Sequence, residues 1–308
     1  MKQVARVLNA VLSHFGLTIV RRSTLEQLSA DLAQFQTLPV HEAAAQISTS
    51  ANLNRELIRH QIAQKWSLVD VMERELAGRH ATRQCPLCGH EADQAAFEQL
   101  TSHCIFGGGT LIRHSCPDCF LVFGPDKMLS LTDHELSQDY EWHYKVYDEV
   151  DSTPVELQAF YALKPVKDGV YLNYGAGAWS SSVPQLRAEG WNVFAYEPHA
   201  AASGEADYVI NDHTQLQQMR FDGIFSNNVL EHLRWPVREL EAMAALLKDE
   251  GRMSHVTPCY DYLFEYSRFH LFFYVGPSRH LLIDKAGLEE ISYSEDGNFK
   301  CSVMKLKV

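Results

Sequence analysis

The sequence lacks a long apolar run, and it has few basic side chains relative to acidic ones. No stretch approaches the roughly 18 apolar residues that a membrane-spanning helix needs, so we predict no transmembrane segment. Its 27 lysines and arginines stand against 39 aspartates and glutamates, a formal net charge of −12. Because clustered lysine and arginine side chains bind phosphate backbones, this balance argues against a nucleic-acid partner.

The first residues also lack the pattern of a secretory signal. "MKQVARVLNAVLSHFGLTIVRR" begins with a basic residue, but polar side chains interrupt its apolar part and no small-residue cleavage site follows. The cysteines are seven, an odd number, and four of them form CxxC pairs, which fits reduced thiols better than disulfides. We therefore expect a cytoplasmic protein. Residues 2–22 carry four basic and no acidic side chains, so a peripheral membrane contact through residues 1–22 is an alternative use of this segment.

Three segments follow one another along the chain. Residues 1–80 predict two helices separated by "QTLPVHEAAAQ", and the second helix has apolar residues at three- and four-residue spacing. This stripe packs either within the monomer or against a second copy, as a homodimerisation arm. Its residues are Leu53, Leu57, Ile58, Ile62, Trp66, Val69, Met72 and Leu76.

Residues 81–150 hold two cysteine pairs and then an aromatic connector, "DYEWHYKVY". The pairs are Cys85-Pro-Leu-Cys88 and Cys116-Pro-Asp-Cys119. A CxxC turn places both sulfurs on one side of a tight loop, and two such loops complete a tetrahedral zinc site. Since four thiolates leave no open coordination position, we predict a structural zinc ion in a zinc ribbon. A redox pair and a site that has lost its metal are the alternatives.

Residues 151–308 alternate between strand and helix patterns. Strands are predicted at "GVYLNYG", "WNVFAYE", "DYVIN", "DGIFSNN" and "GRMSHVTP", and helices at "SSVPQLRAEG" and "VRELEAMAALLKDEG". This alternation predicts an α/β fold with a Rossmann-like, mostly parallel sheet. The end of the chain, from "LEEISYS" to "NFKCSVMKLKV", predicts an antiparallel edge hairpin that turns at Asp296-Gly297.

The stretch "YLNYGAGAWSSS", residues 171–182, has the order strand, glycine turn, helix. Gly175 and Gly177 would let the backbone approach a ligand closely, although two glycines alone are weak evidence. Polar residues after the other strands strengthen it, because open parallel sheets bind ligands at the carboxyl ends of their strands. They are Glu197 after the second strand, Asp212 after the third, and Asn227 and Asn228 after the fourth.

These motifs resemble those of class I S-adenosylmethionine-dependent methyltransferases. "YLNYGAG" is similar to their first motif, "VFAYEP" to the acidic second-strand motif, and "FDGIFSNNVLEHLRWPVREL" to the fourth-strand motif. The cysteine-rich segment resembles the zinc lobe that precedes some sugar methyltransferases, including C-methyltransferases of deoxysugar pathways. The resemblance is specific for the cofactor and unspecific for the substrate.

The resemblance implies S-adenosyl-L-methionine as the cofactor. Glu197 would hold the ribose, Asp212 would lie near the adenine, and Asn227 to Val229 would flank the sulfonium. By position, the cofactor-binding residues would be Asn173, Gly175, Ala176, Gly177, Glu197, Asp212, Asn227, Asn228 and Val229.

Two positions depart from the family pattern. Asn173 stands where an acid is usual, so Asn173→Asp is expected to restore the attraction to the donor's amino group and to tighten binding. Trp179 stands where a dinucleotide loop has its third glycine, which argues against a NAD-binding oxidoreductase, one alternative function. The other alternative is a scaffold protein of zinc ribbon and Rossmann-like sheet that no longer catalyses.

Methyl transfer needs in-line placement and, for a hydroxyl or carbon acid, a base. The candidates are Glu231 and His232 after the fourth strand, and His270 and Tyr274 further on. In some relatives the Glu-His pair helps to bind a metal or to orient the substrate. We expect His232 or His270 to be the base. The predicted acceptor is a small molecule, a sugar or a nucleotide-linked sugar.

Overall fold

The computed structural model describes residues 40–76, 82–148, 150–177, 180–198 and 206–307, with side chains from residue 50 onward. Residues 1–22, for which a membrane contact was one alternative, lie outside the described part, as does the first predicted helix. The chain divides into two units, Met1–Leu57 and Ile58–Val308. The domain boundaries predicted after residues 80 and 150 stay predictions. No helix in the described part is both long enough and apolar enough to cross a membrane.

Helix α3 (Val40–Leu76) is longer than the sequence predicted. Residues 40–46 were assigned to the break between two helices, but they are helical, and their alanines, glutamate and glutamine are good helix formers. The apolar stripe is covered only in part. Ile62 and Trp66 are buried, whereas the side chains of Leu53, Leu57 and Met72 are more than half exposed.

The cysteine lobe, residues 82–123, consists of short antiparallel strands. β1 (Thr82–Gln84) pairs with β2 (Glu91–Asp93) across the first cysteine turn, and a 3-10 turn, η1 (Gln94–Ala96), follows. A second sheet has the order β11-β5-β4-β3. Its strands are β3 (Glu98–His103), β4 (Thr110–Ser115), β5 (Val122–Phe123) and β11 (Phe272–Phe273). Because β11 comes from the C-terminal half of the chain, the lobe shares a sheet with that half.

Two helices connect the lobe to the larger sheet. They are α4 (Asp126–Leu129) and α5 (Asp133–Tyr144). A capping box starts α5: the hydroxyl of Thr132 accepts from the N–H of Glu135, and the Glu135 carboxylate accepts from the N–H of Thr132. These two bonds satisfy N–H groups that have no partner within the helix.

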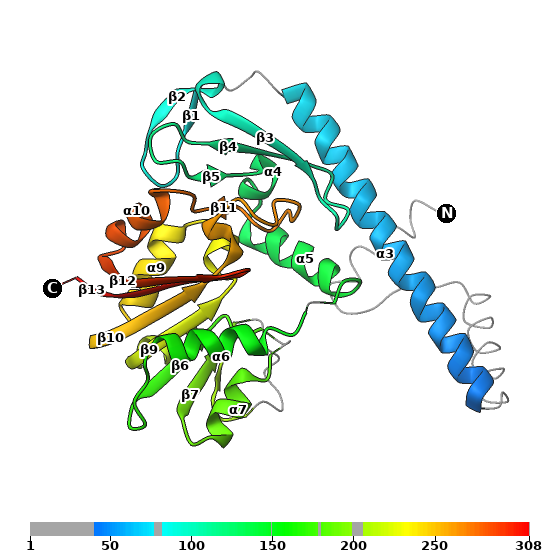
Figure 1. Cartoon of the computed structure of the whole chain (residues 1–308). Coiled ribbons are helices and arrows are strands. Elements are labelled where there is room, and N and C mark those ends of the chain that lie inside the picture. The colour runs from blue at the N-terminus through cyan, green and yellow to red at the C-terminus, as the bar shows by residue number, and fades with distance from the viewer. Residues whose placement is uncertain (1–39, 77–81, 149, 178–179, 199–205, 308) are drawn as a thin grey trace. The chain divides into compact units, whose positions relative to one another are not determined.

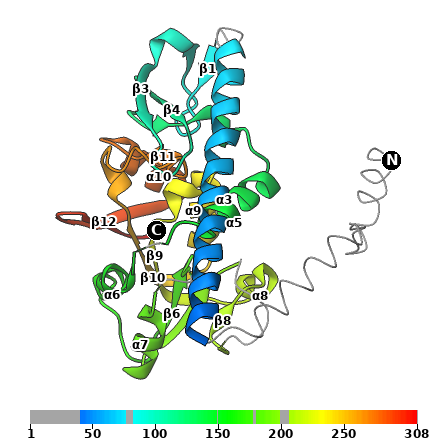
Figure 2. The same ribbon diagram turned by 90° about the vertical axis from the view of Figure 1, so that its right-hand side faces the viewer.

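The larger sheet has seven strands in the order β12-β13-β10-β9-β6-β7-β8 (Figure 1). The five strands from β10 to β8 are parallel, and the C-terminal pair β12–β13 is antiparallel, turning at Gly297 with a φ of +58°. Figure 2 shows β6, β9 and β10 as neighbours in the second view. The strands are β6 (Val170–Tyr174), β7 (Asn192–Tyr196), β8 (Val209–Ile210), β9 (Phe221–Asn227), β10 (Leu247–Val256), β12 (Leu288–Asp296) and β13 (Phe299–Leu306). The prediction of a mostly parallel sheet in an α/β fold is confirmed.

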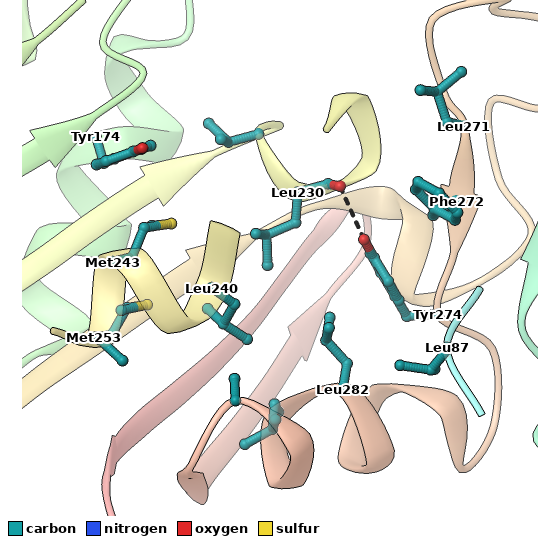
Figure 3. Close-up of a cluster of buried hydrophobic side chains, with 14 of the residues drawn as sticks. Leu87, Tyr174, Leu230, Leu240, Met243, Met253, Leu271, Phe272, Tyr274 and Leu282 are labelled. Carbon is teal, nitrogen blue, oxygen red and sulfur yellow. Dashed lines mark hydrogen bonds between the residues drawn. The ribbon is translucent and has the colours of Figure 1, made fainter. Parts of the chain in front are cut away.

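Helices cover both faces of this sheet, because successive residues of a buried strand point to opposite sides. Tyr171 and Phe225 pack with the helices α6 (Thr153–Ala162) and α7 (Ser182–Ala188). Leu172 and Ile224 belong to the larger core on the other side. Figure 3 shows part of that core, including Leu240 and Met243. That core includes residues of α8 (His213–Gln217), α9 (Pro236–Ala244) and α10 (Ser278–Lys285), and it continues into the cysteine lobe.

One predicted helix is too long. We expected helix through "VRELEAMAALLKDEG", but α9 ends at Ala244 and β10 begins at Leu247. Leu247 is buried and pairs with Phe221, the first residue of β9. Strand pairing therefore overrides the helix propensity of this segment, which is a weak local preference.

Candidate functional site

The four cysteines of the CxxC turns meet in one cluster. The Sγ atoms of Cys85 and Cys119 are 3.6 Å apart, and those of Cys88 and Cys116 are 3.5 Å apart. All four lie within 4.8 Å of one another. Sulfurs around a tetrahedral zinc ion are about 3.8 Å apart, given a Zn–S bond of about 2.3 Å. The donor set and its spacing therefore fit zinc and leave no position open for a substrate.

The two cysteine turns have matching backbones. The N–H of Gly89 donates to the carbonyl of Cys85, and the N–H of Phe120 donates to that of Cys116, each at 3.0 Å. Gly89 and Phe120 each follow a second cysteine, and both have positive φ, +82° and +64°. The hydrogen bond from Cys119 lowers the pKa of Cys85 to about 5. A thiolate at this position is the form that binds a metal.

The glycine loop after β6 requires its first glycine. Gly175 and Gly177 have φ of +74° and +61°, a region that favours glycine. A Cβ on Gly175 would lie 2.7 Å from Cγ2 of Val229, whereas one on Gly177 would meet no atom of the described residues within 4 Å. The N–H groups of Gly175 and Ala176 both donate to the carbonyl of Tyr196, at 2.9 and 3.1 Å. The loop is thus fixed to β7.

Polar groups line the same edge of the sheet. A carboxylate oxygen of Glu197, directly after β7, accepts from the N–H of Gly177 at 3.0 Å. Asp212 accepts from the N–H of Thr214 at 2.8 Å where α8 begins. Asn228, after β9, has a φ of +52°. The predicted cofactor residues at or next to the carboxyl ends of β6, β7, β8 and β9 are Gly175, Ala176, Gly177, Glu197, Asp212, Asn227, Asn228 and Val229.

Asn173 has an unexpected neighbour. Its side chain is 1% exposed, and its amide donates to the Glu156 carboxylate at 2.6 Å. An aspartate at position 173 would place a second buried carboxylate against the first, and like charges this close oppose ionisation. The reason to expect tighter donor binding from Asn173→Asp therefore fails, because an acid already lies here. The sequence reasoning missed Glu156, since a single acid in a helix has no motif spacing.

Glu231, His232 and His270 lie together beyond the end of β9, in and after the 3-10 turn η2 (Leu230–His232). The rings of the two histidines are 5.0 Å apart, edge to face, and the three side chains each have one ligand atom within 4.8 Å of the others. The backbone brings them together, because the N–H of Leu271 donates to the Glu231 carbonyl at 2.7 Å. Such a group can transfer protons or hold a cation.

Burial sets the charges in this group. Glu231 is fully buried, and one oxygen accepts from the hydroxyl of Thr257 at 2.5 Å. The other oxygen has no hydrogen-bond partner in the described part of the chain and lies 3.8 Å from Nε2 of His255. Burial raises the pKa of Glu231 to about 7 and lowers that of His232 to about 4. His232 is therefore neutral near pH 7.

Two tyrosines contact the η2 turn. The hydroxyl of Tyr140, in α5, lies 2.9 Å from Nδ1 of His232, and its ring stacks on Phe269 with 4.2 Å between centroids. Tyr274 is fully buried and donates its hydroxyl to the carbonyl of Leu230 at 2.9 Å (Figure 3). Tyr140 thus contacts the histidine directly, while Tyr274 holds the backbone of the turn.

A buried arginine of the cysteine lobe holds the segment that carries His270. Arg113, in β4, is 0% exposed, and its guanidinium donates to three carbonyls of that segment. These belong to Glu265, Ser267 and His270, at 2.5, 2.7 and 3.1 Å. Arg268, also 0% exposed, donates to Asp139 of α5 at 2.6 Å. Neither role was predictable, because the carbonyl partners of Arg113 have no sequence pattern and the Asp139 partner of Arg268 is 129 residues away.

Arg113→Met is expected to lower the free energy of unfolding by about 2–3 kcal/mol, because it leaves buried carbonyls without their charged donor. Urea unfolding would measure the loss, and limited proteolysis would show whether residues 261–271 are cleaved first. Arg83→Met is the matched control in the same lobe. Its partner Asp126 is 45% exposed, so a change of about 1 kcal/mol or less is expected. Equal losses in the two variants would contradict the role of Arg113.

Residues 149–294 match the model of a family described as a methyltransferase domain. The match covers β6 to β9, the η2 turn, β10 and most of β12, and so includes the glycine loop and the histidine group. It supports a methyltransferase. A search of the curated proteins found no match.

Several solved structures resemble the chain at low identity. Mitomycin 7-O-methyltransferase MmcR has a TM-score of 0.42 and 15% identity, over 57% of this chain and 58% of its own. The 1,6-didemethyltoxoflavin-N1-methyltransferase of Burkholderia thailandensis was solved with bound 1,6-didemethyltoxoflavin and S-adenosylhomocysteine. It has a TM-score of 0.43 and 16% identity, over 64% of this chain and 96% of its own. NcsB1, an O-methyltransferase from neocarzinostatin biosynthesis, has a TM-score of 0.41 and 14% identity, over 57% of this chain and 59% of its own. The chain thus spans under two thirds of the length of MmcR and NcsB1.

Proposed function

We propose that the protein transfers a methyl group from S-adenosylmethionine to a small-molecule acceptor. The observation that carries the proposal is the glycine loop bonded to Glu197 at the carboxyl end of a parallel sheet. His232 follows β9, the strand beside β6, and His270 lies against His232. The domain match over residues 149–294 supports the same activity.

The cofactor-binding residues fit this donor. Glu197 directly follows β7 and bonds the loop at Gly177, which suits a carboxylate that holds ribose hydroxyls. Asp212 would lie near the adenine, and Asn227 to Val229 beside the sulfonium. When bound, S-adenosylmethionine supplies an electrophilic methyl group. The protein has to place the acceptor in line with it and remove a proton.

In this proposal His232 removes the acceptor's proton. Its lowered pKa keeps the imidazole neutral, and the Tyr140 hydroxyl at 2.9 Å from Nδ1 orients the ring. His270 lies against the same ring, and Glu231 lies beneath the pair with one oxygen that no described group bonds. Tyr274 supports the turn from within the core rather than contacting substrate.

The acceptor proposed is a sugar or a nucleotide-linked sugar, on the resemblance of the cysteine lobe to that of sugar methyltransferases. The four cysteines are proposed to bind one structural zinc ion, on their spacing and donor chemistry. Homodimerisation through the N-terminal helices remains a proposal, supported by the exposed Leu53, Leu57 and Met72 of α3.

Calorimetric titration with S-adenosylhomocysteine and with NAD tests the proposal. The wild type is expected to bind the first and not the second. Glu197→Ala should weaken binding of S-adenosylhomocysteine by about 1.5–3 kcal/mol, the range for hydrogen bonds to a charged group. Glu189→Ala is the control, since Glu189 follows α7 and bonds Tyr161 instead. If the wild type does not bind S-adenosylhomocysteine, the alternative of a scaffold protein that no longer catalyses is favoured. If Glu197→Ala binds it with unchanged affinity, Glu197 does not hold the ribose.

A further inference from the structure

A buried carboxylate lies at the base of the glycine loop. Glu156, in α6, is 3% exposed, and its two oxygens accept four hydrogen bonds from side chains on both sides of the loop. The donors are Ser152 at 2.7 Å, Asn173 at 2.6 Å, Ser180 at 2.8 Å and Ser182 at 2.5 Å. Asn173 precedes the loop in β6, while Ser180 and Ser182 follow it at the start of α7. The carboxylate therefore fixes both ends of the loop.

No cation balances this charge within the described part of the chain. All four donors are neutral, and none of the ion pairs between described residues includes Glu156. Burying an ionised carboxylate is costly unless a positive charge lies near it. Four hydrogen bonds offset part of that cost, and a net negative potential remains at the base of the loop. A cationic ligand at the loop would supply the missing positive charge.

We infer that Glu156 is the acidic determinant of cofactor binding in this protein, in place of an acid at position 173. The inference rests on the proposed function. S-adenosylmethionine carries two positive groups, an ammonium and a sulfonium, and one carboxylate, so it binds as a net cation. Glu156 attracts its amino-acid end through space, because its oxygens are already hydrogen-bonded. This explains why residue 173 is an amide: Asn173 donates a hydrogen bond to Glu156 and adds no second negative charge.

The strength of this attraction follows from Coulomb's law. A carboxylate and an ammonium about 8 Å apart, at an effective dielectric constant of about 30, attract each other enough to change a dissociation constant about tenfold. The attraction depends on the ligand's charge. It acts on S-adenosylmethionine and on the zwitterionic S-adenosylhomocysteine, because in the inferred arrangement the ammonium of the bound ligand lies nearer to Glu156 than its α-carboxylate does. It does not act on 5′-methylthioadenosine, which keeps the adenosine and lacks the amino acid.

The test is a calorimetric titration of these three ligands into the full chain and into Glu156→Gln, at equal salt. Glu156→Gln is expected to lower the affinities for S-adenosylmethionine and S-adenosylhomocysteine about tenfold. The affinity for 5′-methylthioadenosine should not change. A loss of the same size for all three ligands would mean that Glu156 only shapes the loop, which would overturn the inference. Unchanged affinities for all three would overturn it too and leave the proposed function standing. A wild type that binds none of them would overturn both.

A swap variant controls for folding. Glu156→Gln combined with Asn173→Asp keeps one carboxylate and one amide in the same hydrogen-bonded pair. It is expected to restore the affinity for S-adenosylhomocysteine to within about threefold of the wild type, since the charge moves by one hydrogen bond only. If Glu156→Gln does not fold, the inference is tested with the swap variant only. The inference requires a retained ratio of the affinities for S-adenosylhomocysteine and 5′-methylthioadenosine, and a tenfold fall in that ratio overturns it.

Discussion

Cys116→Ser is expected to abolish zinc binding and to unfold the cysteine lobe. Cys116 is fully buried, and its sulfur lies 3.5 Å from that of Cys88, so a serine would remove one of four ligands and leave the other thiols without their metal. A structural zinc site contributes folding free energy of the order of 10 kcal/mol in isolated zinc fingers. Metal analysis should show one zinc per chain in the wild type and less than 0.1, roughly a tenfold loss of occupancy, in the variant.

Cys104→Ser is the control for the cysteine cluster. Cys104 lies in the same lobe but outside the group of four, and its sulfur is 3.9 Å from a nitrogen of Arg268. This variant should keep its zinc and its midpoint of urea unfolding. Native protein that is well folded and zinc-free would contradict the zinc proposal and favour a lapsed site.

Loss of zinc is also expected to disturb the histidine group, because the lobe shares the sheet β11-β5-β4-β3 with the segment that carries His270. β11 pairs with β5 of the lobe two residues after His270, and Arg113 of the lobe bonds the carbonyl of His270 itself. A lobe that unfolds therefore releases the segment that places His270 beside His232. The affinity for S-adenosylhomocysteine should change less, since the glycine loop is bonded to β7 and α6.

Local patterns explain why much of the fold was predictable. The cysteine cluster follows from two CxxC turns, and the strands β6, β7, β8 and β9 follow from short apolar runs that end in polar residues. The carboxyl ends of parallel strands must meet at one edge, so Glu197 and Asp212 could be placed without coordinates. The end of α9 was misjudged because the pairing of Leu247 with Phe221 is a tertiary effect.

Contacts between distant segments explain what could not be predicted. His232 and His270 meet through the bond from the N–H of Leu271 to the carbonyl of Glu231, and a backbone bond between loops has no sequence signature. The same holds for Arg113, whose partners are carbonyls. Asn173 was identified as a departure from the family pattern, but its cause, Glu156 in the preceding helix, became visible only in the structure.

His232→Asn is expected to lower kcat by about 10²–10⁴-fold, the usual contribution of a general base, with the acceptor that the wild type methylates. Formation of S-adenosylhomocysteine with a panel of sugars and nucleotide-linked sugars would identify that acceptor and then measure the loss. Asparagine keeps a polar group beside the Tyr140 hydroxyl but cannot accept the proton, so the affinity for S-adenosylhomocysteine should stay within about threefold, less than the tenfold that corresponds to 1.4 kcal/mol.

His280→Asn is the matched control, because His280 lies in α10 with a side chain that is 61% exposed and pairs with Glu290. Its kcat should equal that of the wild type. The kcat of His270→Asn is needed to interpret the result. If His232→Asn keeps its kcat while His270→Asn loses it, the base is His270, and the contact with Tyr140 then serves to position the turn. If both variants keep full activity, neither histidine is the base, and proton removal must be assigned to another group or to solvent.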